Sequence, residues 1–325
     1  MGSAQLLNEL RRANALTLAP GSYRARGVPW CSGHYVAIAH DGNVAVLIPC
    51  QPGEPRRPPI ELENLVVRFG ATCEVFSGME RHSGLFTSVQ CRSHERGLQD
   101  YFLSVVDRFV LVDSNAPVRQ VIGTLVELFR CLGEPPRKAA SGLFGELMLI
   151  EAAASTARAT EAWHSDVDAR YDFAGGPYRI EVKSSASRLR QHEFSAEQCD
   201  VPAECVGIVA SVFVERVGAG LSLAELLARL EQRLEHVPAL VLKLHQQVAA
   251  TLGTSLQQGL SMAFDEQLAR RSICFFHASS IPGLRAPFPT GVSSVRFTAD
   301  LSGLVPLGGL EIDKLIEFPL ARIGA

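Results

Sequence analysis

A proline pair, Pro135-Pro136, separates two parts of this 325-residue chain that have different hydrophobic patterns. Proline lacks a backbone N–H and disfavours helix at the residue before it, so the pair interrupts regular structure. Short runs rich in β-branched and aromatic residues precede the break, whereas helical spacing alternates with strands after it. We therefore expect an α+β or α/β protein: a β-rich N-terminal domain over residues 1–115, a connecting helix and proline-rich linker over 116–138, and an α/β domain over 139–325 with a helical C-terminal part.

The N-terminal domain is expected to consist mainly of short strands. The clearest signal is a hairpin in which Asp41-Gly42-Asn43 joins His34–His40 to Val44–Ile48, because Gly and Asn favour tight hairpin turns. Further strands are expected at residues 65–69, 85–89 and 109–112. Apolar residues at helical spacing then predict a helix over residues 117–132.

Helices and strands alternate in the pattern that follows the linker. A buried strand is expected at Val206–Val214, and Ser222 and Glu225 form a capping-box pattern at the start of a helix. Two more helices are expected at Pro238–Leu252 and Leu256–Arg270. The pattern ends with expected strands at residues 273–276 and 295–297.

The charge of the chain limits how it could bind nucleic acid. Its 31 basic and 34 acidic side chains give a net charge of −3, whereas a protein that coats nucleic acid through bulk charge is basic. Any nucleic-acid contact must therefore be a local patch. The basic residues are mostly arginines, so each lysine is informative; the four lysines are Lys138, Lys183, Lys243 and Lys314.

Hydrophobic runs in this chain are short. The longest, Val206–Val214, is well below the ~18 residues that a membrane-spanning helix requires. The first residues show no basic region followed by an apolar block, which is the pattern of a secretion signal. We expect a cytoplasmic protein without a membrane partner.

One acidic residue lies on the apolar stripe of a predicted helix. In Gly142–Glu151, Glu146 follows Leu143 by three residues and precedes Ile150 by four, which places it on the same helix face as these two. A buried carboxylate is costly unless it is paired or binds a metal. The alternative is a glutamate at the edge of the stripe that reaches solvent or an arginine.

A second group of charged residues lies on a predicted hairpin. Residues 174–177 form a turn between Arg170–Phe173 and Tyr178–Lys183. Because side chains alternate along a strand, Asp172, Glu181 and Lys183 converge on one surface if the register is ordinary. Neighbouring carboxylates repel unless a divalent cation lies between them, and an all-oxygen site suits Mg²⁺ or Mn²⁺. The alternative is a solvated face that carries charges of both signs.

These motifs resemble those of the PD-(D/E)XK nuclease superfamily, which has the restriction-endonuclease-like fold. Gly145-Glu146, Asp172, Glu181-Val182-Lys183 and Gln198 carry the resemblance. More narrowly, the segments are similar to those of a bacterial family that is described as PD-(D/E)XK members and is found near restriction and phage-defence genes. The resemblance covers about residues 140–200, and Tyr171 stands where the superfamily name has a proline.

The resemblance implies a central mixed sheet flanked by helices and a role for each matching residue. Asp172, Glu181, Glu146 and the carbonyl of Val182 would hold a metal ion, Mg²⁺ with Mn²⁺ as a substitute. Lys183 would be the catalytic lysine and Gln198 would lie beside it. The residues expected to contact the DNA phosphate or to order the adjoining loop are Ser184, Ser185, Arg188, Arg190 and His192.

The expected function is therefore that of a Mg²⁺-dependent DNA endonuclease in bacterial restriction or anti-phage defence. The alternatives are a non-catalytic or partner-dependent DNA-binding adaptor of a defence complex, and a nuclease that acts on RNA. Cutting both strands with one site per chain suggests a homodimer. No glycine precedes a lysine, so the chain lacks a Walker A loop, and a helicase, ATPase or methyltransferase would be a separate partner.

Overall fold

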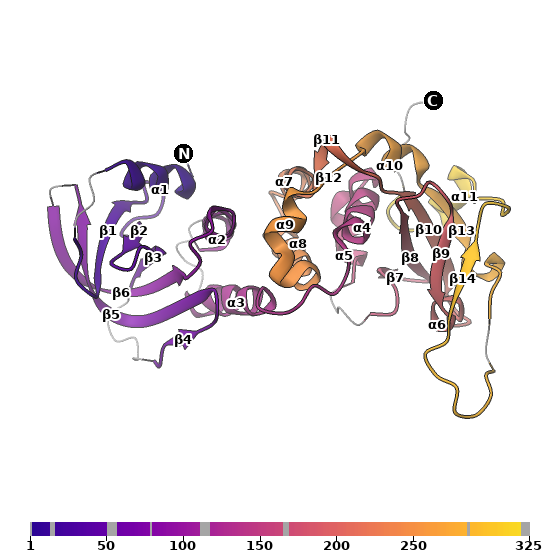
Figure 1. The fold of residues 1–325 in the computed structure, drawn as a ribbon, viewed down its shortest axis with the longest axis horizontal. Helices are drawn as coiled ribbons and strands as arrows, with labels where there is room; N and C mark the ends of the chain where they lie inside the picture. Colours follow the sequence, from indigo (N-terminus) through magenta and orange to yellow (C-terminus); the bar gives the residue numbers. More distant parts are fainter. Residues whose placement is uncertain are drawn as a thin grey trace. The chain divides into compact units, whose positions relative to one another are not determined.

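The computed structural model describes residues 2–13, 17–50, 57–78, 80–110, 118–164, 169–284 and 287–319. Tertiary contacts divide the chain into two compact units, Met1–Pro135 and Pro136–Ala325. Both units mix helices with sheets, so the fold class is α+β (Figure 1). No helix in these described ranges is long and apolar enough to cross a membrane.

The first unit contains a six-stranded sheet in the order β1-β2-β3-β6-β5-β4. Its strands are β1 (Ser22–Gly27), β2 (Tyr35–Ala39), β3 (Val44–Pro49), β4 (Ile60–Glu61), β5 (Leu65–Ser77) and β6 (Glu80–Cys91). A parallel pairing of β1 with β5 closes five of these strands into a barrel, and β4 lies outside it on the far edge of β5. The predicted hairpin of residues 34–48 is confirmed as β2 and β3.

The barrel is narrow and small side chains fill much of it. Its core cluster includes Ala25, Ala37, Ala39 and Ala45, together with larger residues such as Phe86. A closed five-stranded barrel has little interior space, so alanines at inward positions allow the strands to close on one another.

The expectation of a mainly β first unit missed two helices, α1 (Ser3–Arg12) and α2 (Arg96–Phe109). The predicted strand at residues 109–112 is wrong at its first residue, because Phe109 ends α2, while residues 111 and 112 lie outside the described part. Its β-branched composition was misleading, since Phe102, Val105 and Val106 continue at helical spacing and are buried. The predicted connecting helix is α3 (Val118–Cys131); Pro117 lies outside the described residues.

The second unit is built on a mixed sheet in the order β13-β10-β8-β7. Its strands are β7 (Phe173–Gly175), β8 (Tyr178–Ser185), β10 (Val206–Phe213) and β13 (Cys274–His277). Strands β8 and β10 are parallel, and the other neighbours are antiparallel. The predicted strands at 206–214 and 273–276 correspond to β10 and β13.

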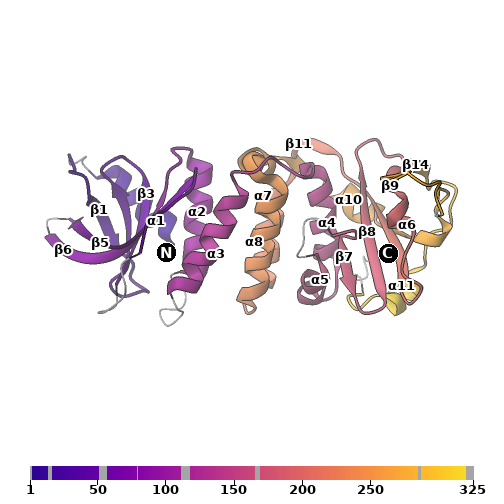
Figure 2. The ribbon, with the colours of Figure 1, turned by 90° about the horizontal axis from the view of Figure 1, so that it is seen from below.

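Helix α4 (Ala140–Ala152) packs against β8 on one side and against α7 on the other (Figures 1 and 2). Every residue from Leu143 to Ala152 is buried, so the single apolar stripe inferred from the sequence is too narrow a description. The other helices of this layer are α5 (Thr156–Ala162), α7 (Leu223–Arg233), α8 (Pro238–Leu252) and α9 (Leu256–Ser261), with the short 3₁₀ turn η1 (Gly253–Ser255). Ser222 and Glu225 form the predicted capping box of α7.

The predicted helix over Leu256–Arg270 is wrong, because the structure breaks it into two. After α9 the chain forms β12 (Ala263–Phe264), which pairs with β11 (Arg216–Ser222), and then α10 (Glu266–Ser272). The Asp265 side chain accepts a hydrogen bond from the Leu268 backbone and caps α10. The apolar spacing therefore continues across two separate helices, α9 and α10, with the short strand β12 and the cap residue Asp265 between them.

The other face of the sheet is covered by a second, two-stranded sheet and a short helix. These are β9 (Gln191–Ser195), β14 (Arg296–Asp300) and α6 (Ala196–Cys199), and the predicted strand at 295–297 corresponds to β14. Phe194, Val209, Phe276 and Leu301 belong to the core that joins them to the sheet. The unit also contains η2 (Ala278–Ser280) and α11 (Gly309–Leu315).

Candidate metal centre

The candidate site lies at the edge of β8, at the point where its neighbour β7 begins. Strand β7 has three residues, and Phe173 pairs with Ile180, so Asp172 lies across from Glu181. Beyond β7 the backbone of β8 lacks that strand partner, and the Val182 N–H donates to Asp172 Oδ2 at 2.8 Å. The short edge strand thus fixes the Asp172 carboxylate against β8.

Glu146 reaches the same edge from α4. The residue is 3% exposed, and its carboxylate accepts a hydrogen bond from Trp163 Nε1 at 2.8 Å, with His164 Nε2 at 3.6 Å. The alternative of a glutamate that reaches solvent is therefore wrong. A Cβ on the preceding residue, Gly145, would overlap the Ser184 hydroxyl, so glycine allows α4 to approach β8 closely and brings Glu146 to the sheet.

Lys138 joins the two carboxylates and was not identified from the sequence. Its ammonium lies 2.9 Å from Glu146 Oε1 and 2.6 Å from Asp172 Oδ1. The lysine side chain is 38% exposed, whereas the two carboxylates are 4% and 5% exposed. Lys138 belongs to the segment before α4, which the Arg137 N–H anchors to the carbonyl of Thr251.

Glu181 and Lys183 point to the face of β8 that is turned away from α4. Gln198 contacts both of them there. Lys183 Nζ lies 2.8 Å from Glu181 Oε1 and donates to Gln198 Oε1 at 3.1 Å. Gln198 Nε2 donates to Glu181 Oε1 at 2.6 Å. The side chain of Gln198 also accepts from the Ser195 backbone in the capping box of α6. The amide is therefore held in an orientation that presents its oxygen to the lysine and its nitrogen to the carboxylate.

Burial and mutual repulsion shift the pKa values of the acidic residues. Burial and, next, the charge of Asp172 raise the pKa of Glu181 to about 8, against the opposing effect of Lys183. Burial and the Glu146 charge likewise raise the pKa of Asp172. Burial would raise the pKa of Glu146 too, but the hydrogen bond from His164 and the charge of Lys138 lower it.

The pKa of Lys138 responds to the same charges in the opposite direction. Burial would lower it, but the charges of Asp172 and Glu146 outweigh that effect and raise it. When all groups are ionised, three buried carboxylates face two ammonium groups, Lys138 and Lys183. In that fully ionised state the centre has one uncompensated negative charge, and the raised pKa of Glu181 reflects the cost of this charge when no further cation is bound.

Three side chains of the described residues offer ligand atoms that lie within 4.8 Å of one another: Glu146, His164 and Asp172. Carboxylate oxygens suit Mg²⁺ or Mn²⁺, and an imidazole suits transition metals. This donor set fits a divalent cation. Glu181 is outside this group of three but lies across the strand pair from Asp172. A role of the Val182 carbonyl as a ligand stays a prediction.

The structure separates the residues that were expected to contact phosphate. Ser184 faces α4 at Gly145, and its hydroxyl oxygen is buried without a hydrogen-bond partner. The Ser185 hydroxyl lies 3.2 Å from that of Ser187. Arg188 is exposed on the following loop and donates to Glu215 at 2.8 Å.

Arg190 and His192 are directed into the protein interior. Arg190 donates to the Ser211 hydroxyl at 2.8 Å and to the Ser272 carbonyl at 2.7 Å, and it joins β10 to the end of α10. His192 is 4% exposed, and its Nε2 lies 2.7 Å from the same Ser211 hydroxyl. Burial lowers the pKa of His192 to about 4, to which the charges of Lys183 and Arg190 contribute. Both side chains therefore have hydrogen-bond partners within the protein.

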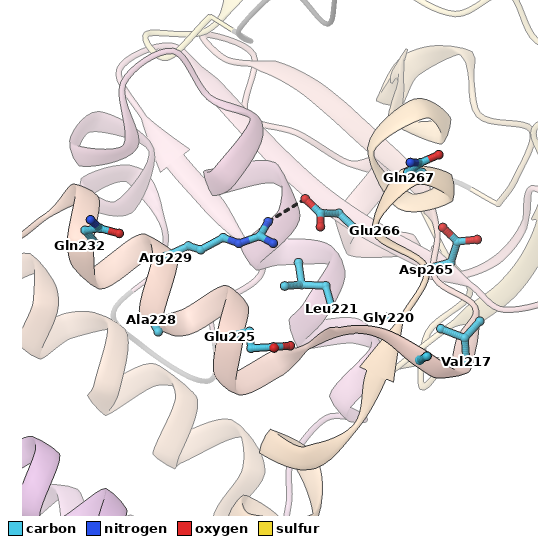
Figure 3. Close-up of a pocket in the computed structure, with 11 residues that line it drawn as sticks. Val217, Gly220, Leu221, Glu225, Ala228, Arg229, Gln232, Asp265, Glu266 and Gln267 are labelled. Atoms are coloured by element: carbon cyan, nitrogen blue, oxygen red, sulfur yellow. Dashed lines mark hydrogen bonds and ion pairs between the residues drawn. The ribbon is translucent and has the colours of Figure 1, made fainter. Parts of the chain in front are cut away.

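A separate groove of about 690 Å³ lies between β11, α7 and α10 (Figure 3). Arg229 of α7 reaches across it to Glu266 of α10, with 2.7 Å between the guanidinium and carboxylate atoms. None of the carboxylates of the candidate centre lines it. The groove and the centre are therefore different features of this unit.

Comparison with known proteins gives one family. The model of a family described as "Putative PD-(D/E)XK family member, (DUF4420)" matches residues 9–302. No curated protein and no solved structure matches the chain. The matched range contains Lys138, Glu146, Asp172, Glu181, Lys183 and Gln198.

Proposed function

Because this chain belongs to that PD-(D/E)XK family, we propose that it is a metal-dependent nuclease that hydrolyses phosphodiester bonds in DNA. The observation that carries the proposal is that the Asp172 carboxylate is held against β8 across from Glu181, which in turn pairs with Lys183. These are the acid, acid and lysine of the motif, and Glu146 adds a buried acid from α4.

We propose Mg²⁺ as the metal, with Mn²⁺ as a substitute, and Asp172, Glu146 and Glu181 as the residues that hold it. A divalent cation supplies Lewis acidity toward a phosphoryl oxygen and lowers the pKa of bound water. The excess of buried carboxylates over ammonium groups supports this assignment. His164 would add a nitrogen donor or would orient Glu146 from behind.

Lys183 is the residue that would act on the reacting groups. A lysine ammonium is compact, and can orient an attacking water and stabilise charge that develops on the phosphate. Gln198 fixes the position of this ammonium beside Glu181 through its two hydrogen bonds. The cation–π contact with the Phe194 ring, at 5.1 Å from the ring centre, restricts the lysine further.

The biological setting follows from the family resemblance alone. We propose a role in bacterial restriction or anti-phage defence, as a homodimer where both strands are cut, or with a separate helicase, ATPase or methyltransferase. The exposed Arg188 lies on the loop after β8 and would be available to a phosphate when its pair with Glu215 opens.

The test is a cleavage assay with plasmid, linear and single-stranded DNA, and with RNA, in Mg²⁺, Mn²⁺ or EDTA. We expect the wild type to cut DNA only with metal, and Lys183→Ala and Asp172→Ala to lose cleavage. Lys243→Ala is a matched control, because Lys243 donates to the backbone carbonyl of Glu161 and not to a carboxylate of the centre. Equal cutting by wild type and Lys183→Ala would exclude this mechanism, and preferential cutting of RNA would change the substrate.

A further inference from the structure

We propose that Lys138 is an internal cation of the metal centre, which competes with the divalent metal for Glu146 and Asp172. This inference rests on the proposed function, because it assigns a role at the same centre. It adds a residue that lies outside the family motif and comes from the segment that precedes α4.

The ammonium occupies the position between the two carboxylates. It contacts Glu146 Oε1 at 2.9 Å and Asp172 Oδ1 at 2.6 Å. The other oxygen of each carboxylate is already engaged, Glu146 Oε2 by Trp163 and Asp172 Oδ2 by the Val182 N–H. The two oxygens that face each other are therefore those that Lys138 bridges.

A metal ion that binds both of these oxygens cannot coexist with the ammonium. Mg²⁺ binds oxygen at ~2.0–2.1 Å, and a metal this close to Oε1 and Oδ1 would take the space and the charge role of Nζ. The two cations also repel each other. Metal binding must then displace Lys138, and this displacement reduces the apparent affinity for the metal.

The Lys138 ammonium also has a role when no metal is bound. Two carboxylates that are 4% and 5% exposed would repel each other if no cation lay between them. Lysine suits this role better than arginine, because an ammonium is a compact charge and a guanidinium is a wide planar fork. The choice stands out in a chain with only four lysines among 31 basic residues.

The surroundings of Lys138 allow it to move without unfolding the unit. Its side chain is 38% exposed. It also lines a cavity of about 380 Å³, formed with Pro136, the start of α4, and residues of α9 and β12 that include Phe264. This cavity could receive the aliphatic part of the lysine when the ammonium leaves the carboxylates.

The first experiment measures Mn²⁺ binding to the full-length protein by isothermal titration calorimetry. We expect Lys138→Met to bind Mn²⁺ at least ten-fold more tightly than wild type, whereas Lys243→Met binds like wild type. In EDTA, Lys138→Met should melt at a lower temperature than wild type, because its carboxylates lose their counter-ion. If Lys138 had only a structural role, its replacement would weaken the metal-free fold but would not strengthen metal binding.

Two further variants separate the possible failures. Lys138→Gln removes the charge but keeps hydrogen-bond donors, so it tests the same point if Lys138→Met does not fold. Equal or weaker Mn²⁺ binding by the neutral variants, with binding by wild type intact, would overturn the competition and leave the metal centre standing. If wild type and Asp172→Asn both fail to bind Mn²⁺, the proposed centre itself is wrong, and the role of Lys138 falls with it.

The second experiment uses the wild-type protein alone. Four lysines give a simple peptide map, in which the acetylation of each can be followed by mass spectrometry. We expect Mn²⁺ to increase the acetylation rate of Lys138 several-fold, because its ammonium is released from the carboxylates, while exposed Lys314 reacts at an unchanged rate. An unchanged rate at Lys138 under Mn²⁺ saturation would contradict the displacement.

Discussion

At the residue scale, the centre depends on groups that hold one another rather than on isolated acids. Gln198 connects Glu181 to Lys183, Trp163 holds one oxygen of Glu146, and a backbone N–H holds one oxygen of Asp172. Each carboxylate therefore has a fixed orientation. Such support keeps ligands and catalytic groups in place during a reaction.

Gln198 is a positioning residue whose loss should affect the reaction more than the binding of DNA. We expect Gln198→Leu to lower kcat by about 10- to 100-fold with little change in KM, because the amide contacts Glu181 and Lys183. Steady-state cleavage kinetics give this split. Gln191→Leu is the matched control, since Gln191 contacts Asp300 on the neighbouring strand. A change confined to KM would instead assign Gln198 to substrate binding.

His192 should make the folded protein sensitive to acid. Burial lowers its pKa from 6.5 to about 4, so the unfolded chain binds the proton first as the pH falls below 6.5. The free energy of unfolding therefore falls between pH 6.5 and 4. The loss from this residue is at most about 2 kcal/mol at pH 5.

Urea unfolding of wild type and His192→Gln at pH 7 and pH 5 measures this effect. The glutamine can still bond to Ser211 but cannot be protonated, so the variant should lose less stability between the two values. Identical losses in both proteins would show that His192 is protonated in the folded state.

The sequence predicted the residues of the motif, but not the neighbouring residues that contact them. Strand alternation predicted a shared surface for Asp172, Glu181 and Lys183, and the family resemblance added Glu146 to them; their catalytic roles stay predictions. Lys138, Trp163 and His164 were missed, because they lie on irregular segments whose paths depend on distant contacts. The segment of Lys138 is anchored at Thr251, and Trp163 forms a bridge with Phe173.

At the element scale, the approach of α4 to β8 brings Glu146 to the sheet. Gly145 faces Ser184 at this crossing, and a Cβ on Gly145 would overlap the Ser184 hydroxyl in its present position. The helix is buried on all sides, so a displacement on one side moves its contacts with α7 as well. The close contact of one glycine with one strand residue thus controls the position of an acid at the centre.

Gly145→Ala should destabilise the protein by about 1–3 kcal/mol, because the added methyl group overlaps the Ser184 hydroxyl. Chemical denaturation measures the loss, and Gly145→Ala combined with Ser184→Gly should recover a large part of it. Gly142→Ala on the same helix is the control, since a Cβ there meets nothing within 4 Å. Equal effects of the two alanines would mean that helix propensity, and not the crossing, determines the result.

Elements with a local sequence signal were predicted, whereas elements that depend on distant strand pairing were not. The capping box at Ser222 and the hairpin of β2 and β3 were found because each signal is local. The split of residues 256–270 into α9, β12 and α10 was not found, because Phe264 is placed by its pairing with β11. The closure of the barrel through β1 and β5 depends on residues about fifty positions apart, which no local period reveals.

At the scale of the whole molecule, the charge of the centre couples metal binding to the stability of the second unit. A ligand that binds only the folded state stabilises it by about 2.7 kcal/mol at a concentration of 100 Kd. The buried carboxylates exist as a group only in the folded chain, so a divalent cation should stabilise the fold.

Differential scanning calorimetry in Mn²⁺ and in EDTA tests this coupling. We expect a higher melting temperature for wild type in Mn²⁺ and no such increase for Asp172→Asn, which keeps the shape of the side chain but removes its charge. An equal increase in both proteins would indicate that the metal binds elsewhere.

The most direct test of the account is a crystal structure of the protein with Mn²⁺, in which anomalous scattering locates the metal. We expect an anomalous peak beside Glu146 and Asp172 at the edge of β8, with the Lys138 ammonium displaced from both. A peak at another site, or Lys138 still bridging the two carboxylates at saturating Mn²⁺, would contradict it.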